Sequence, residues 1–79
     1  MTLFEEIREI ISEQLEIKPE IIKPGASFID LGITLSDAIE LVLETGEMLG
    51  VEIPDEDAEK MGTVGDLVGY LENKIENIV

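Results

Sequence analysis

A two-faced segment in the middle of the chain restricts the fold more than any other feature. When residues 35–49 are turned by about 100° per residue, their side chains separate into two faces. One face is mainly apolar and carries Ala38, Leu41, Val42, Thr45 and Leu49. The other face is acidic and carries Asp37, Glu40, Glu44 and Glu47. Thr34 and Asp37 have the spacing of an N-terminal capping box, and Gly50 is suited to a left-handed helix stop. We therefore predict an amphipathic helix over residues 35–49.

Two further segments have the same period and the same kind of start. The run T-L-F-E at 2–5 is a capping box that opens a helix ending near Glu16, and T-V-G-D at 63–66 opens a last helix. Their core-facing residues are expected to be Leu3, Ile7, Ile10, Ile11 and Leu15 in the first, and Val64, Leu67, Val68, Leu71, Ile75 and Ile78 in the last. Between them, residues 55–60 are expected to form one or two helical turns capped by Asp55.

The rest of the chain connects these helices. Pro19 and Pro24 interrupt the helical pattern. The apolar residues of this long connection are expected to lie beneath the helices, and they are Ile17, Ile21, Ile22 and Phe28. No segment alternates convincingly as a strand does. The expected fold is an all-α four-helix bundle with three long helices and one short helix, in a single domain over residues 1–79.

The composition excludes several classes of function. The chain of 79 residues has 19 acidic and 5 basic residues, a formal net charge of −14. Binding to nucleic acid or to an anionic membrane needs clustered basic residues, so we expect neither, and we expect partners with basic patches instead. Without cysteine or histidine there is no thiol nucleophile and no imidazole base, so we do not expect an enzyme. No apolar run approaches the length of a membrane span, and a cytoplasmic monomer is the expectation.

At this point the residues resemble the acyl carrier proteins, along nearly the whole chain. The motifs are S-F-I-D-L-G at 27–32, D-A-I-E-L-V at 37–42, I-P-D-E-D-A-E-K at 53–60 and T-V-G-D at 63–66. The resemblance implies a non-catalytic carrier whose 4′-phosphopantetheine arm, attached to a serine at the start of the second helix, holds acyl chains as thioesters. It also implies that the acidic second helix docks on a phosphopantetheinyl transferase and on acyl-processing enzymes of fatty acid, polyketide or related metabolism.

The attachment motif itself departs from the family pattern. Where the family reads L-G-x-D-S-L, residues 31–36 read L-G-I-T-L-S, so Leu35 stands at the serine position and Ser36 follows it. We expect Leu35 to turn toward Val42 at the core edge, and Ser36 to point outward near the helix N-terminus, which suits a phosphodiester. Ser36 is therefore the candidate attachment residue, displaced by about 100°. Thr34 is better explained as the cap.

A second hypothesis for this helix, in which Ser36 is not modified, is equally consistent with the residues. A serine in the first turn of a helix is often a polar residue without a further role. The chain would then be an unmodified acidic adaptor that docks on enzymes through its second helix. Docking residues in either case are expected on the acidic face and its outward apolar edge, namely Asp37, Ile39, Glu40, Leu43, Glu44 and Glu47.

Two further expectations concern ligands. A groove for the acyl chain is expected between the helices, lined by Val42, Leu49, Met61, Leu67, Val68 and Leu71. The acidic run at 55–59 does not have the spacing of a calcium-binding loop, and acids at a helix N-terminus need no metal, so no metal site is expected.

Overall fold

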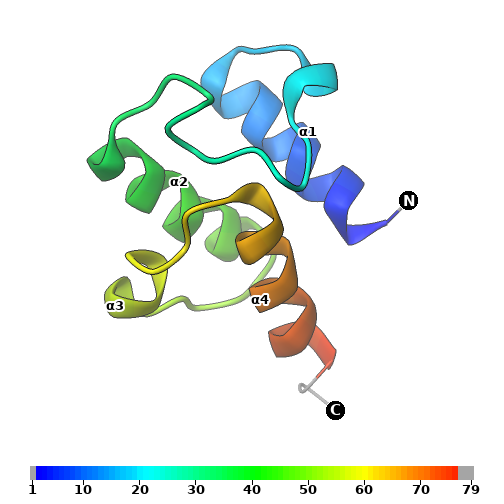
Figure 1. The fold of residues 1–79 in the computed structure, drawn as a ribbon. Coiled ribbons are helices and arrows are strands. Elements are labelled where there is room, and N and C mark those ends of the chain that lie inside the picture. The colour runs from blue at the N-terminus through cyan, green and yellow to red at the C-terminus, as the bar shows by residue number, and fades with distance from the viewer. Residues whose placement is uncertain (1, 77–79) are drawn as a thin grey trace.

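Four α-helices and one short 3-10 helix make up the computed structural model, which describes residues 2–76. They are α1 (Leu3–Leu15), the 3-10 helix η1 (Pro19–Ile21), α2 (Leu35–Met48), α3 (Asp55–Ala58) and α4 (Val64–Glu76). Figure 1 shows that the three long helices enclose one interior, while α3 lies against α2. The predicted all-α class with three long helices and one short helix is confirmed. Within residues 2–76 no helix is both long and apolar enough to cross a bilayer.

Local hydrogen bonds start the helices where the sequence predicts. The Glu5 N–H donates to the Thr2 hydroxyl at 3.2 Å, and the Thr2 N–H donates to the Glu5 carboxylate at 3.3 Å, which completes a capping box. Thr63 and Asp66 exchange the same pair of bonds, both at 3.1 Å. Each box satisfies N–H groups that a helix N-terminus leaves without an intrahelical partner. The first turns of α1 and α4 are therefore stabilised by residues three positions apart.

The short helix begins differently from the prediction. Asp55 is the first helical residue of α3, whereas Pro54 occupies the N-cap position with no capping side chain. The helix also ends at Ala58 rather than Lys60, because Lys60 bonds back to Asp57 in a tighter turn, with 3.1 Å between its N–H nitrogen and the carbonyl oxygen. The prediction that Asp55 caps this helix is therefore wrong.

The long connection between α1 and α2 is held against the start of α4. Backbone N–H groups donate from Phe28 to Gly62 at 3.1 Å and from Gly65 to Pro24 at 2.8 Å. A Cβ atom on Gly65 would lie 2.7 Å from the Pro24 carbonyl oxygen, so only glycine permits this approach. Phe28 and Ile22 are buried, as predicted for residues beneath the helices. Ile21 is 52% exposed, so the same prediction is wrong for it, because it ends the surface helix η1.

A second close approach joins α2 to the segment that follows it. A Cβ atom on Gly46 would lie 2.7 Å from Ile53 Cδ1 and 2.8 Å from the Val51 carbonyl oxygen. The Val51 N–H in turn donates to the Gly46 carbonyl at 2.8 Å. Gly46 therefore lets residues 51–53 pack directly on the backbone of α2, which places α3 beside that helix.

Candidate functional site

A tight turn presents the start of α2 to solvent. The Ser27 hydroxyl accepts a 3.0 Å hydrogen bond from the Asp30 N–H, and the Gly32 N–H donates to the Ile29 carbonyl at 3.0 Å. Gly32 has a φ of +86°, a conformation that glycine adopts without strain. The chain then extends into Thr34, whose hydroxyl accepts from the Asp37 N–H at 3.2 Å. Thr34 therefore caps α2 as predicted, but the reciprocal bond from the Asp37 side chain that would complete a capping box is not recorded within residues 2–76.

Ser36 differs from the other hydroxyl residues of the chain. Thr2, Ser12, Ser27, Thr34, Thr45 and Thr63 each form a side-chain hydrogen bond. Ser36 is exposed, and the structure records no hydrogen bond for its hydroxyl within residues 2–76. It is the second residue of α2, where N–H groups without intrahelical partners give the helix a partial positive charge. A phosphate group on this hydroxyl would meet favourable electrostatics from the helix.

Leu35 does not pack at the core edge as the sequence suggested. Its side chain is 61% exposed. As the first residue of α2 it leans toward the N-terminal end of the helix, where no preceding helical turn covers it. A helical wheel represents a continuous helix, whereas Leu35 lies at the helix end, and for this reason the prediction of its burial is wrong. The helix start therefore displays an exposed aliphatic side chain on the residue before Ser36.

The edge of the acidic face is less exposed than predicted. Ile39 and Leu43 are half-buried and pack against the core, so the expectation that both point outward is wrong. On the wheel both lie within about 60° of Gly46, the position on which residues 51–53 pack. Part of each side chain still borders the surface, where it can contribute apolar contact area.

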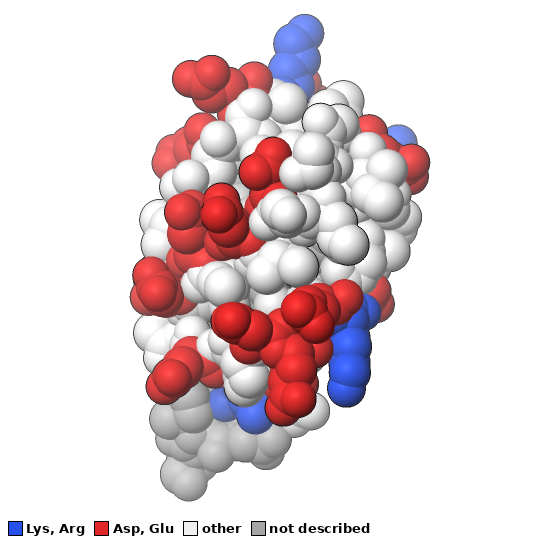
Figure 2. Space-filling model, turned by 90° about the vertical axis from the view of Figure 1, so that its left-hand side faces the viewer, with Lys and Arg blue, Asp and Glu red and all other residues white. Residues whose placement is uncertain are grey.

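The acidic face itself lies at the surface. Its four residues, Asp37, Glu40, Glu44 and Glu47, are all exposed. Figure 2 views the molecule from the side on which α2 begins, and carboxylate groups are spread over this side while lysine and arginine lie near its margins. Close carboxylates with few neighbouring cations produce a negative potential that attracts basic surfaces over a Debye length.

A hydrogen bond from α4 holds one acidic side chain of α3, that of Asp57. The Tyr70 hydroxyl donates to Asp57 Oδ2 at 2.8 Å. Burial, this hydrogen bond and the Asp57 charge, in that order, raise the pKa of Tyr70 above its ordinary value of 10.0. Sequence reasoning missed this pair, because residues 13 positions apart leave no periodic signal. Among residues 2–76, no group of three or more acidic side chains is arranged to hold a metal ion.

Comparison with known proteins identifies the family. A family model described as a phosphopantetheine attachment site matches residues 5–71, which include Ser36 and the whole acidic face. The chain belongs to the acyl carrier protein family. It is 47% identical to the acyl carrier protein of Wolinella succinogenes over 73 residues, covering 91% of this chain and 96% of that protein. It is 42% identical to that of Campylobacter hominis over 78 residues, covering 98% and 99%.

Membership of the family defines the general activity of the carrier. Acyl carrier proteins hold acyl groups on a phosphopantetheine arm and do not themselves catalyse reactions. Their partners are phosphopantetheinyl transferases and acyl-processing enzymes. The residues of this carrier fit such an arm, because an exposed hydroxyl stands at the positive end of α2. The arm supplies a thiol that forms thioesters, whereas the protein supplies the attachment point and the surface around it.

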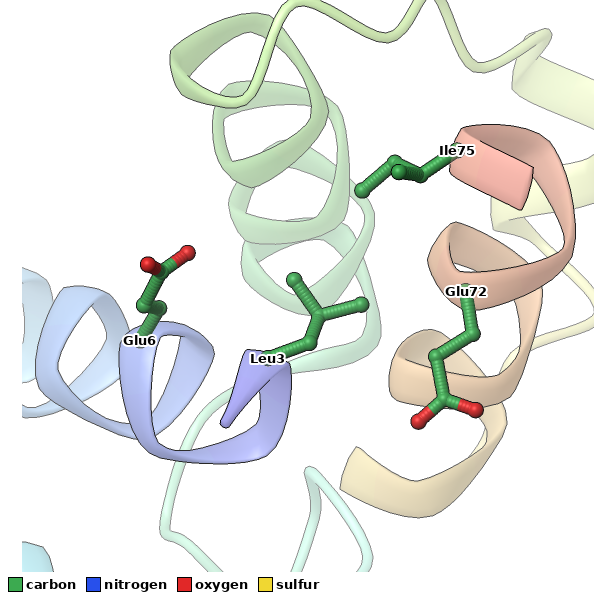
Figure 3. A pocket seen from close by; sticks show the side chains of 4 residues that line it. All are labelled: Leu3, Glu6, Glu72 and Ile75. Carbon is green, nitrogen blue, oxygen red and sulfur yellow. The ribbon is translucent and has the colours of Figure 1, made fainter. Parts of the chain in front are cut away.

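The residues expected to line an acyl groove form the packed core of the carrier. Val42, Met61, Leu67, Val68 and Leu71 are buried, and Leu49 is half-buried. A pocket of about 320 Å³ lies elsewhere, between α1 and α4. Figure 3 shows Leu3 and Ile75 extending into the space between these helices, and Glu6 and Glu72 complete the lining of the pocket. Ile75, predicted in the core, is 40% exposed here, and Ile78 lies outside the described residues.

Proposed function

We propose that this carrier holds its phosphopantetheine arm on Ser36, one position after the residue that the family pattern indicates. The proposal rests on which hydroxyl groups near the start of α2 already take part in a hydrogen bond. Ser36 combines solvent exposure, a position at the helix N-terminus and a hydroxyl with no recorded hydrogen bond within residues 2–76. Thr34, the neighbouring hydroxyl residue, accepts the capping bond that starts α2.

The loading reaction transfers phosphopantetheine from coenzyme A to the Ser36 hydroxyl. The Ser36 oxygen attacks the phosphorus of coenzyme A that bears pantetheine, and the pyrophosphate P–O bond breaks. Adenosine 3′,5′-bisphosphate leaves, and a base of the transferase takes the hydroxyl proton. The product is a phosphodiester whose negative charge lies at the positive end of α2. The carrier contributes the nucleophilic oxygen and a favourable site for the new charge.

We further propose that the acidic face presents the loaded arm to biosynthetic enzymes with basic docking patches, in fatty acid or related acyl metabolism. Glu40 lies one turn beyond Ser36, so a partner that binds the acidic face is held close to the arm. Ile39 and Leu43 add apolar contact at the border of this face. The strong net charge favours a monomer, because two copies would repel each other.

The attachment is tested by intact mass. The wild-type carrier is incubated with coenzyme A and a broad-specificity phosphopantetheinyl transferase, beside Ser36→Ala and the control Ser27→Ala. The proposal expects the mass gain of one phosphopantetheine in the wild type and the control, and none in Ser36→Ala. A gain that persists in Ser36→Ala would place the arm on another residue.

The unmodified adaptor is the second candidate. The observation that favours it is the exposed Leu35 at the position where the family pattern has its serine. Such an adaptor would dock through the same acidic face without an arm. The mass of the protein purified from its own cells separates the two candidates, because only a carrier gains the mass of the arm.

A further inference from the structure

Two adjacent residues at the start of α2 are both exposed, and one is apolar whereas the other is polar. Leu35 shows 61% of its surface to solvent, and Ser36 follows it in the first turn. Adjacent Cα atoms are about 3.8 Å apart, so an enzyme that binds around the Ser36 oxygen also comes close to the exposed Leu35 side chain. The environment that a transferase offers to Leu35 therefore contributes to its affinity for this carrier.

The geometry of the helix end keeps the Leu35 side chain exposed at the start of α2. Thr34 is extended and capped to Asp37, and the side chain of the first helical residue leans away from the following turns. Leu35 also lies outside the buried core of the carrier. An apolar subsite in a transferase would gain from enclosing this side chain. In a subsite whose polar groups normally bind a carboxylate, Leu35 would leave those polar groups without a hydrogen-bond partner, which is unfavourable.

We propose that Leu35 determines which transferase loads this carrier. The matching transferase has an apolar subsite beside its catalytic centre, and transferases that read an acidic residue before the serine discriminate against the chain. This inference rests on the proposed attachment at Ser36. Leu35 acts through recognition alone, since the group that reacts is the hydroxyl of its neighbour.

The test compares two sources of transferase on matched variants. One source is a purified transferase that loads carriers with the aspartate–serine order, and the other is a cell extract of the organism that encodes this chain. Wild type, Leu35→Asp and Leu35→Ala are each loaded with coenzyme A, and initial rates are followed by intact mass. Ile29→Asp is the control, because Ile29 is 69% exposed in the preceding turn without adjoining Ser36. Circular dichroism checks that each variant is helical.

The expected signature is a reversal of preference. With the purified transferase, Leu35→Asp is loaded at least about tenfold faster than wild type, and with the extract it is loaded at least about tenfold slower. The loading rate of Leu35→Ala lies between those of wild type and Leu35→Asp with each source. The rate of the control Ile29→Asp stays within about twofold of wild type. A structural effect of the substitution would change both rates in the same direction, so the reversal isolates recognition.

Three outcomes would overturn the inference, and they separate it from the proposed attachment. Equal loading of wild type and Leu35→Asp by both sources would remove the role of Leu35 while leaving Ser36 as the attachment site. Rates that change in one direction with both sources would do the same. Failure of both sources to load the wild type, with helical structure intact, would remove the attachment at Ser36 and the inference together.

Discussion

The Tyr70 hydroxyl donates a 2.8 Å hydrogen bond to Asp57, and this bond ties α4 to the short helix α3. Asp57 is half-buried, and α3 has only four residues. A helix of that length has almost no stability of its own. The position of α3 therefore depends on contacts such as this one and on the packing of residues 51–53 against Gly46.

Tyr70→Phe should loosen α3. The variant keeps the ring and removes the donor, so we expect a loss of about 1 kcal/mol in the free energy of unfolding, measured by urea denaturation. Backbone amides of α3 should exchange faster with solvent, while those of α1 keep their relative protection. An unchanged unfolding curve and unchanged exchange in α3 would show that the bond does not hold the helix.

The same bond should make stability depend on alkaline pH. The pKa of Tyr70 is raised above 10.0, so folding favours the neutral phenol. Its stabilising contribution is then fully present below the unfolded pKa and is lost as the pH rises through the folded pKa. The difference in unfolding free energy between wild type and Tyr70→Phe should be full at about pH 8 and smaller at about pH 11. A difference that grows with pH would contradict the assigned direction.

Gly46→Ala should destabilise the fold, although alanine is the better helix former. The new methyl group would meet Ile53 Cδ1 at 2.7 Å and the Val51 carbonyl oxygen at 2.8 Å, and a backbone atom cannot move aside cheaply. We expect a net loss of about 1–3 kcal/mol in thermal or urea unfolding. Gly69→Ala in α4 is the matched control, because nothing lies within 4 Å of its added Cβ.

The control Gly69→Ala should raise the free energy of unfolding, whereas Gly46→Ala lowers it. In open space alanine gains about 0.5–1 kcal/mol over glycine in a helix. If both substitutions stabilised the carrier, the close packing of residues 51–53 on Gly46 would be wrong. If both destabilised it equally, the helix backbone would be the cause rather than the contact.

Charge reversal on the acidic face should weaken docking specifically. Glu40→Lys with Glu44→Lys is compared with Glu9→Lys and Glu13→Lys on α1, which are exposed at the same spacing and change the net charge equally. We expect kcat/KM for loading to fall about tenfold or more for the first pair, with a weaker dependence on salt, and within about twofold for the second. Equal losses for both pairs would mean that net charge matters and the acidic face does not.

Much of this fold follows from short windows of sequence. The capping boxes at Thr2 and Thr63 and the cap at Thr34 join residues three apart, so their geometry is encoded within one helical turn. The helical period likewise predicts the burial of Leu41 and Val42. Exposure of Ser36 follows from the same period, because it lies opposite the apolar face.

Only the tertiary structure decides the features that depend on distant segments or on the end of a helix. Ile39 and Leu43 are half-buried because they pack against the core that the other elements complete, and Leu35 is exposed at the first position of the helix. The bond between Tyr70 and Asp57 needs the chain to bring α3 and α4 within hydrogen-bonding reach of each other. Sequence periodicity describes one helix at a time, whereas these contacts depend on the path that the chain takes between helices.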